Sequence, residues 1–153
     1  MKKIFYYLLP VLCLFLFLNC EDDDEVDSFM LTHADTKWKH VDGDTTDYVH
    51  IDMDKIHEYA IDPNNSTCCT WSTATGTHTD CDDISYTNTM HVNKGDTLEM
   101  DIIYGSASMP DESVLMIVSG SAMTVKLTHG TFTETHTYNK TTESLPSVTC
   151  TGS

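Results

Sequence analysis

Short segments in which apolar and polar residues alternate are the feature that most constrains the fold of this 153-residue chain. The clearest segment spans residues 97–104. Its four apolar residues, Leu98, Met100, Ile102 and Tyr104, alternate with Thr97, Glu99 and Asp101. Because successive side chains of a β-strand point to opposite faces, this period of two predicts a strand with one buried face.

The same period recurs between turn signals along most of the chain, and we find no helix of convincing length. In residues 84–92, Ile84, Tyr86, Met90 and Val92 are predicted to share one face. The predicted strands are 37–41, 48–53, 55–61, 69–71, 84–92, 97–104, 114–118, 123–127 and 131–138. Eight or nine strands in series predict an all-β, antiparallel up-and-down barrel of about eight strands, because closure removes exposed edges. An immunoglobulin-like β-sandwich is the alternative.

The N-terminus has the pattern of an export signal. Lys2 and Lys3 precede an apolar run over residues 4–18, which is shorter than the 18–20 apolar residues of a transmembrane helix. The run ends in Leu-Phe-Leu-Asn-Cys at residues 16–20, which resembles a bacterial lipobox. The resemblance implies that residues 1–19 are a signal peptide and that Cys20 is acylated, which would anchor the protein in a membrane.

An acidic segment follows the lipobox directly. Six of the seven residues 21–27 are Asp or Glu, so the segment should stay solvated and extended as a spacer. It is similar to the acidic export signal of Bacteroidetes surface lipoproteins. That similarity implies a lipid-anchored protein in the outer membrane, facing the cell exterior. We therefore divide the chain into a signal peptide (1–19), a lipidated cysteine with its linker (20–28) and a single barrel domain (29–153).

The domain itself resembles the small lipocalin-like domains of Bacteroidetes lipoproteins. The resemblance rests on a first strand with a tryptophan (Thr36-Lys37-Trp38-Lys39), a hairpin over residues 48–61, and a final strand pair over residues 123–128 and 132–140. The usual glycine before the tryptophan strand is absent, and Asp35-Thr36 stands in its place. The resemblance implies a cup-shaped barrel and carries over no catalytic residue.

Such a barrel suggests a binding module that holds a small apolar or amphipathic ligand. The candidate cavity residues are Trp38, Trp71, Tyr86, Met100, Phe132 and His136. One alternative is a structural lipoprotein that docks on an outer-membrane partner. A second alternative is a divalent metal site formed by His50, Asp52 and His57, although a solvated hairpin face is the favoured interpretation of these residues.

The domain contains four cysteines, at positions 68, 69, 81 and 150. An even number in an exported protein suggests two disulfides. A bond between the adjacent Cys68 and Cys69 would be strained. We therefore expect one of these two to pair with Cys81 and the other with Cys150, and the sequence leaves open which.

Composition excludes several function classes. The chain has 24 acidic residues, eight lysines, no arginine and a net charge of −16, which disfavours nucleic-acid binding because phosphate neutralisation needs clustered basic residues. We find no nucleophile motif and no glycine-rich phosphate loop. The sequence therefore predicts neither an enzyme nor a bound cofactor.

Overall fold

The computed structural model describes residues 27–106 and 109–152. Within them a four-residue helix, α2 (Phe29–Thr32), precedes ten strands. The strands are β1 (Thr36–Asp42), β2 (Thr45–Ile51), β3 (Lys55–Ile61), β4 (Ser66–Ser72), β5 (Gly76–Thr79), β6 (Ser85–Lys94), β7 (Thr97–Ile103), β8 (Glu112–Ser119), β9 (Ala122–His129) and β10 (Phe132–Thr141).

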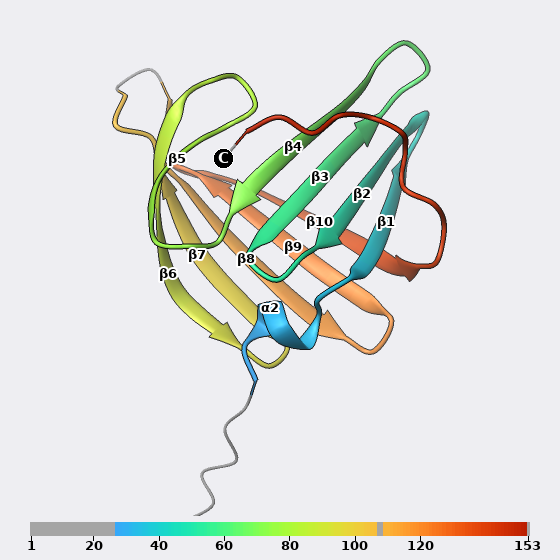
Figure 1. Cartoon of the computed structure of the whole chain (residues 1–153), viewed down its shortest axis with the longest axis horizontal. Coiled ribbons are helices and arrows are strands. Elements are labelled where there is room, and N and C mark those ends of the chain that lie inside the picture. Colours follow the sequence, from blue (N-terminus) through green and yellow to red (C-terminus); the bar gives the residue numbers. More distant parts are fainter. Residues whose placement is uncertain (1–26, 107–108, 153) are drawn as a thin grey trace, which may run out of the picture.

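All ten strands of the described residues belong to one antiparallel sheet (Figure 1). Its order is β4-β3-β2-β1-β10-β9-β8-β7-β6-β5, so β1 pairs with β10 and the ring is interrupted only between β4 and β5. This confirms the predicted all-β, up-and-down barrel. The immunoglobulin-like sandwich is wrong, because the strands form one sheet rather than two.

The strand number, ten rather than about eight, is the main difference from the sequence prediction. The segment that we did not predict is β5, whose sequence is Gly-Thr-His-Thr. It pairs only with β6 and has no apolar side chain to alternate with polar ones. The hydrophobic pattern therefore could not reveal it.

A β-bulge between Met90 and Val92 changes which residues of β6 face the core. Met90 pairs with the inward-facing Met100, but after the bulge Val92 pairs with the exposed Glu99. The prediction that Val92 shares a face with Met90 is therefore wrong, because a bulge inserts one residue and reverses the alternation. The reversal places Asn93 opposite the buried Leu98, and its Oδ1 accepts a hydrogen bond of 3.2 Å from the Met30 backbone N–H.

Helix α2 covers one end of the barrel, so the interior is closed there (Figure 1). Phe29 and Met30 are buried and belong to the same hydrophobic cluster as the inner faces of the strands. Ser28 caps the helix by accepting a hydrogen bond from the Leu31 N–H. Within the described residues, no helix has the length and hydrophobicity needed to span a membrane.

The C-terminal tail lies along the outside of β1–β4 and ends beside the gap in the ring (Figure 1). Leu145 and Val148 pack on the outer-face residues Tyr48 and Tyr59. The Thr151 carbonyl accepts a hydrogen bond of 2.8 Å from the Thr70 N–H, which extends the edge of β4. The tail therefore covers backbone groups of an edge strand that would otherwise be unpaired.

Candidate functional site

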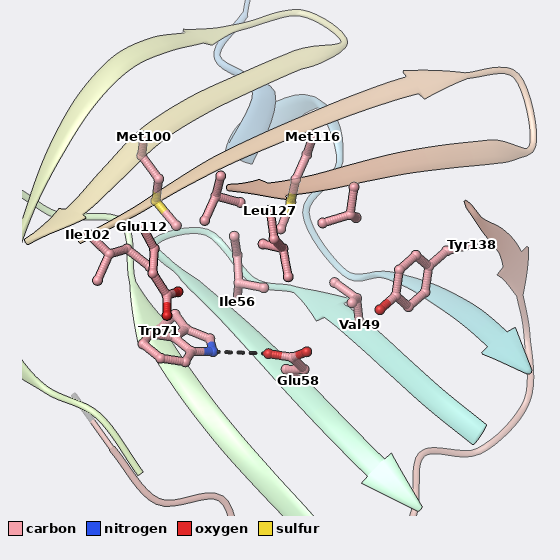
Figure 2. A pocket seen from close by; sticks show the side chains of 12 residues that line it. Val49, Ile56, Glu58, Trp71, Met100, Ile102, Glu112, Met116, Leu127 and Tyr138 are labelled. Atoms are coloured by element: carbon pink, nitrogen blue, oxygen red, sulfur yellow. Dashed lines mark hydrogen bonds between the residues drawn. The ribbon is translucent and has the colours of Figure 1, made fainter. Parts of the chain in front are cut away.

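The interior of the barrel contains a cavity of about 70 Å³, lined mostly by apolar side chains (Figure 2). The strands β2, β3, β4, β7, β8, β9 and β10 all contribute to it. Its lining residues are Val49, Ile56, Glu58, Trp71, Met100, Ile102, Glu112, Val114, Met116, Val125, Leu127 and Tyr138. Two of these twelve side chains are carboxylates, which is unusual for a surface that is otherwise apolar.

Glu58 lies on β3 two residues after the buried Ile56, so both side chains face the interior. The indole Nε1–H of Trp71 donates a hydrogen bond of 3.3 Å to Oε2 of Glu58. Many protein atoms surround this side chain, yet part of its surface is exposed to solvent. Burial raises the pKa of Glu58, the hydrogen bond from Trp71 opposes this shift, and the charges of Asp47 and Glu112 add to it.

Glu112 is the second interior carboxylate and begins strand β8, two residues before the buried Val114. Its Oε1 lies 3.1 Å from Nδ1 of His129, the residue directly opposite on β9. Burial raises the pKa of Glu112, while the charge of His129 and its hydrogen bond lower it. Unlike Glu58, Glu112 therefore has a potential counter-ion beside it.

Polar side chains of β1, β2 and β10 lie near Tyr138, outside the cavity lining. The His40 ring lies 5.3 Å from the rings of both His136 and Tyr138, measured between centroids. Burial raises the pKa of Asp47, and the charges of His40 and His136 oppose the shift. Burial also raises the pKa of Tyr138, as do the charges of Glu58 and Asp47. Tyr138 therefore remains a neutral hydrogen-bond donor at physiological pH.

The structure places the six cavity candidates from the sequence in three different environments. Trp71 and Met100 line the cavity. Trp38 and Tyr86 are buried in the core cluster, outside the cavity lining. His136 is half-buried, 3.3 Å from Glu134, and Phe132 is 61% exposed at the start of β10.

Of the twelve lining residues, the cavity candidates from the sequence include only Trp71 and Met100, and the two carboxylates, Glu58 and Glu112, are among those missed. Each occurs in phase with apolar residues that face the interior, Ile56 for Glu58 and Val114 for Glu112. An acidic residue at an inward position of a strand is the signal that identifies them.

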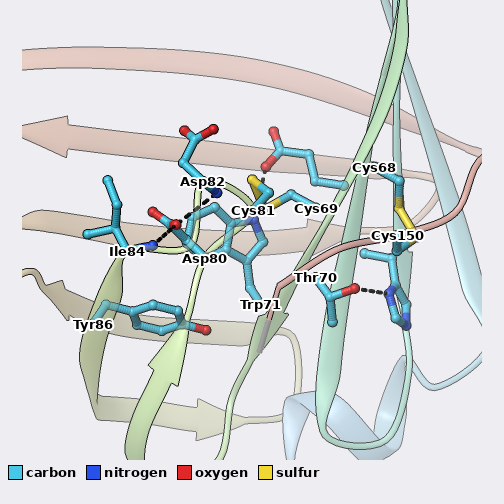
Figure 3. The surroundings of a disulfide bond; sticks show 12 residues. Cys68, Cys69, Thr70, Trp71, Asp80, Cys81, Asp82, Ile84, Tyr86 and Cys150 are labelled. Carbon is cyan, nitrogen blue, oxygen red and sulfur yellow. Dashed lines mark hydrogen bonds between the residues drawn. A yellow bond between two sulfur atoms is a disulfide. The ribbon is translucent and has the colours of Figure 1, made fainter.

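Both predicted disulfides are present, and they lie beside the gap in the ring (Figure 3). Cys68 pairs with Cys150 of the tail, and Cys69 pairs with Cys81, which follows β5. Adjacent residues of a strand point to opposite faces, so Cys68 and Cys69 reach different partners. Inside the gap, the Ser72 N–H donates a hydrogen bond of 3.0 Å to the Tyr86 hydroxyl. Covalent and hydrogen bonds therefore connect β4 to β5 and β6 where strand pairing stops.

In the described residues, the metal-site candidates His50, Asp52 and His57 do not form a ligand cluster. His50 and His57 are paired across β2 and β3, and their rings stack at 5.6 Å. The Nδ1 atom of His57 contacts the Thr70 hydroxyl at 3.0 Å. The Oδ1 atom of Asp52 accepts a hydrogen bond from the Met53 N–H. In residues 27–106 and 109–152, no group of three or more His, Cys, Asp or Glu side chains could hold a metal ion.

No family model, no curated protein and no solved structure matches this chain. Cys20, the residue that the sequence predicts to be lipidated, lies outside the described residues.

Proposed function

We propose that this protein is a lipid-anchored, lipocalin-like barrel of the outer membrane that faces the cell exterior and binds a small apolar or amphipathic ligand. The observation that carries the ligand-binding proposal is the apolar interior cavity, in a barrel that α2 covers at one end. Concave apolar pockets with a few converging polar groups are the usual form of small-molecule sites. The lipobox-like segment and the acidic segment support the proposed location in the outer membrane.

The cavity volume restricts the ligand. At about 70 Å³ the cavity is well below the roughly 300–1,000 Å³ of pockets for drug-sized molecules. It is also smaller than the engineered cavity of about 150 Å³ that admits benzene. The ligand is therefore a molecule of a few heavy atoms, or a longer molecule that inserts one short end.

The docking alternative has less support. It would be favoured by a contiguous exposed aromatic patch. Of the large apolar side chains that are exposed in the described residues, Phe132 is the one aromatic member. Ligand binding therefore remains the primary proposal.

The anchor is tested by the variant Cys20→Ala. We expect radiolabelled palmitate to be incorporated into the wild-type protein and to be lost entirely in the variant, because acylation requires the Cys20 thiol. Protease added to intact cells should degrade the anchored wild type if it faces outward. Full labelling of the variant, or protection from protease until the cells are lysed, would contradict the proposal.

Ligand binding is tested with the series ethanol, 1-propanol, 1-butanol and 1-hexanol. Since a buried methylene contributes about 0.8 kcal/mol, affinity should rise about fourfold per carbon until the cavity is full. The chain has two tryptophans, so 5-fluorotryptophan labelling gives one ¹⁹F resonance for each. The Trp71 resonance should shift because Trp71 lines the cavity.

A variant that fills the cavity provides the control for this series. Leu127→Phe should weaken 1-butanol binding at least fivefold, since Leu127 lines the cavity. Leu115→Phe, one strand away and absent from the lining, should leave it unchanged. Equal effects of the two substitutions would place binding elsewhere, and absence of any shift up to 1-hexanol would refute an apolar site.

A further inference from the structure

We propose that the barrel interior selects a small organic cation, namely an alkylammonium ion whose positive group binds Glu58 while its short apolar chain fills the cavity. This inference rests on the proposed ligand-binding function and names the chemical class of the ligand.

The first observation is that Glu58 has no counter-ion of its own. In the described residues its carboxylate takes part in no ion pair. Its hydrogen-bond partner is the neutral indole N–H of Trp71, on Oε2. An ionised carboxylate has about four acceptor positions, so most of those on Glu58 remain for a donor from the ligand.

The second observation is the sign of the charges around the cavity. The lining contains Glu58 and Glu112 but no lysine, and the chain has no arginine. Glu112 and Asp47 each raise the pKa of Glu58, whereas His136 lowers it, so the side chains around this carboxylate leave it in a net negative environment. A fatty acid or a phosphate ester would add another negative charge to this environment, which disfavours it.

A neutral apolar ligand is also a poor match for the whole site. It would displace water from Glu58 without offering a charge, and an unpaired carboxylate out of water is costly. An ammonium group supplies both the charge and three N–H donors. The ligand that satisfies every group of the lining therefore combines a short hydrocarbon with a cation.

The aromatic side chains near Glu58 are a third observation. Trp71 on β4 and Tyr138 on β10 line the cavity together with Glu58 (Figure 2). The Nε1–H edge of Trp71 faces the Glu58 carboxylate and donates the hydrogen bond to it. Both rings add apolar surface to the lining, against which the hydrocarbon chain of the ligand would pack.

The experiment compares three probes that share a short chain but differ in charge: butylammonium, 1-butanol and butyrate. The full chain, labelled with 5-fluorotryptophan and kept in a non-ionic detergent, is titrated with each probe while both ¹⁹F resonances are followed. We expect butylammonium to shift the Trp71 resonance with a Kd at least tenfold lower than that of 1-butanol. Butyrate should bind more weakly than either.

Three variants separate the role of Glu58 from general charge and folding effects. Glu58→Gln should weaken butylammonium binding at least tenfold, and by a larger factor than it changes 1-butanol binding. Glu58→Asp keeps the charge and should retain part of the affinity. Glu99→Gln removes one negative charge from the exposed outer face of β7 and should change neither. An unchanged Trp38 resonance shows that each variant is folded, because Trp38 is fully buried.

The outcomes distinguish this inference from the function on which it rests. If 1-butanol binds as tightly as butylammonium and Glu58→Gln has no effect, cation selection is refuted while apolar ligand binding survives. Tightest binding of butyrate also refutes it. If none of the three probes shifts the Trp71 resonance, both proposals fail.

Discussion

Reduction of the two disulfides is expected to lower the free energy of unfolding by up to about 7.5 kcal/mol. In the chain-entropy model, the Cys69–Cys81 bond, with a sequence separation of 12, contributes about 3 kcal/mol. The Cys68–Cys150 bond, with a separation of 82, contributes about 4.5 kcal/mol. Because domains of this size are stable by about 5–15 kcal/mol, the reduced protein should be close to unfolding at 25 °C.

The position of the bonds explains why we expect little compensation. The ring of strands is interrupted between β4 and β5, and both cysteines of β4 that form disulfides lie at that edge. The tail is held there by hydrogen bonds between Thr70, Thr151 and Cys68, and Gly152 fits against the carbonyls of Thr70 and Thr79. Without the Cys68–Cys150 bond, these hydrogen bonds, the Lys39–Glu143 ion pair and the small apolar contacts of Leu145 and Val148 must retain the tail.

Urea unfolding with and without reductant measures the total loss of unfolding free energy. Two double variants, each with serine in place of both cysteines of one disulfide, measure the contribution of each bond. Replacing Cys68 and Cys150 should lower the free energy of unfolding more than replacing Cys69 and Cys81, because the Cys68–Cys150 bond closes the longer loop. Replacing Cys69 and Cys81 should instead increase proteolysis near β5. An unchanged urea midpoint in reductant, with thiols confirmed by titration, would contradict the expectation.

The sequence predicted the barrel because the alternating pattern survives in the strands that form most of its wall. β7 is the clearest case, since Leu98, Met100 and Ile102 are all buried as predicted. Two features escaped because they leave no hydrophobic signal. β5 has no apolar residue, and the bulge at His91 depends on backbone pairing between β6 and β7.

The candidate site was harder to predict than the fold, for a physical reason. The residues that line the cavity come from seven strands. The hydrophobic pattern of one sequence shows which face of its strand a residue occupies. It does not show whether that residue borders the cavity or packs in the core around it. Trp38 and Trp71 look equivalent in sequence, yet Trp38 is fully buried outside the cavity lining and Trp71 is part of that lining. Glu58 can be identified only from its position two residues after Ile56, which places both side chains on the inner face of β3. The neighbouring His57, a metal-site candidate, belongs to the opposite face.

Because Trp38 is fully buried and Trp71 borders the cavity, the two side chains should stabilise the fold to different extents. Trp38→Ala should lower the free energy of unfolding by about 3–5 kcal/mol, the usual cost of removing a fully buried tryptophan. Trp38 has no exposed surface, its Nε1–H donates to the Thr36 hydroxyl at 2.9 Å, and its ring packs near His33. Its loss therefore leaves a void where α2 meets the strands and leaves the Thr36 hydroxyl without that donor.

Trp71→Ala is the matched comparison. Trp71 is half-buried and already borders empty space, so its removal should cost less, about 1–2 kcal/mol, within the range of ordinary substitutions. It should also enlarge the cavity and shift the best alcohol of the series to a longer chain. Urea unfolding gives the two free energies, and calorimetric titration with the alcohols gives the second effect. A loss below 1 kcal/mol for Trp38→Ala, or equal losses for the two variants, would contradict the expectation that the fully buried Trp38 stabilises the fold more than Trp71 does.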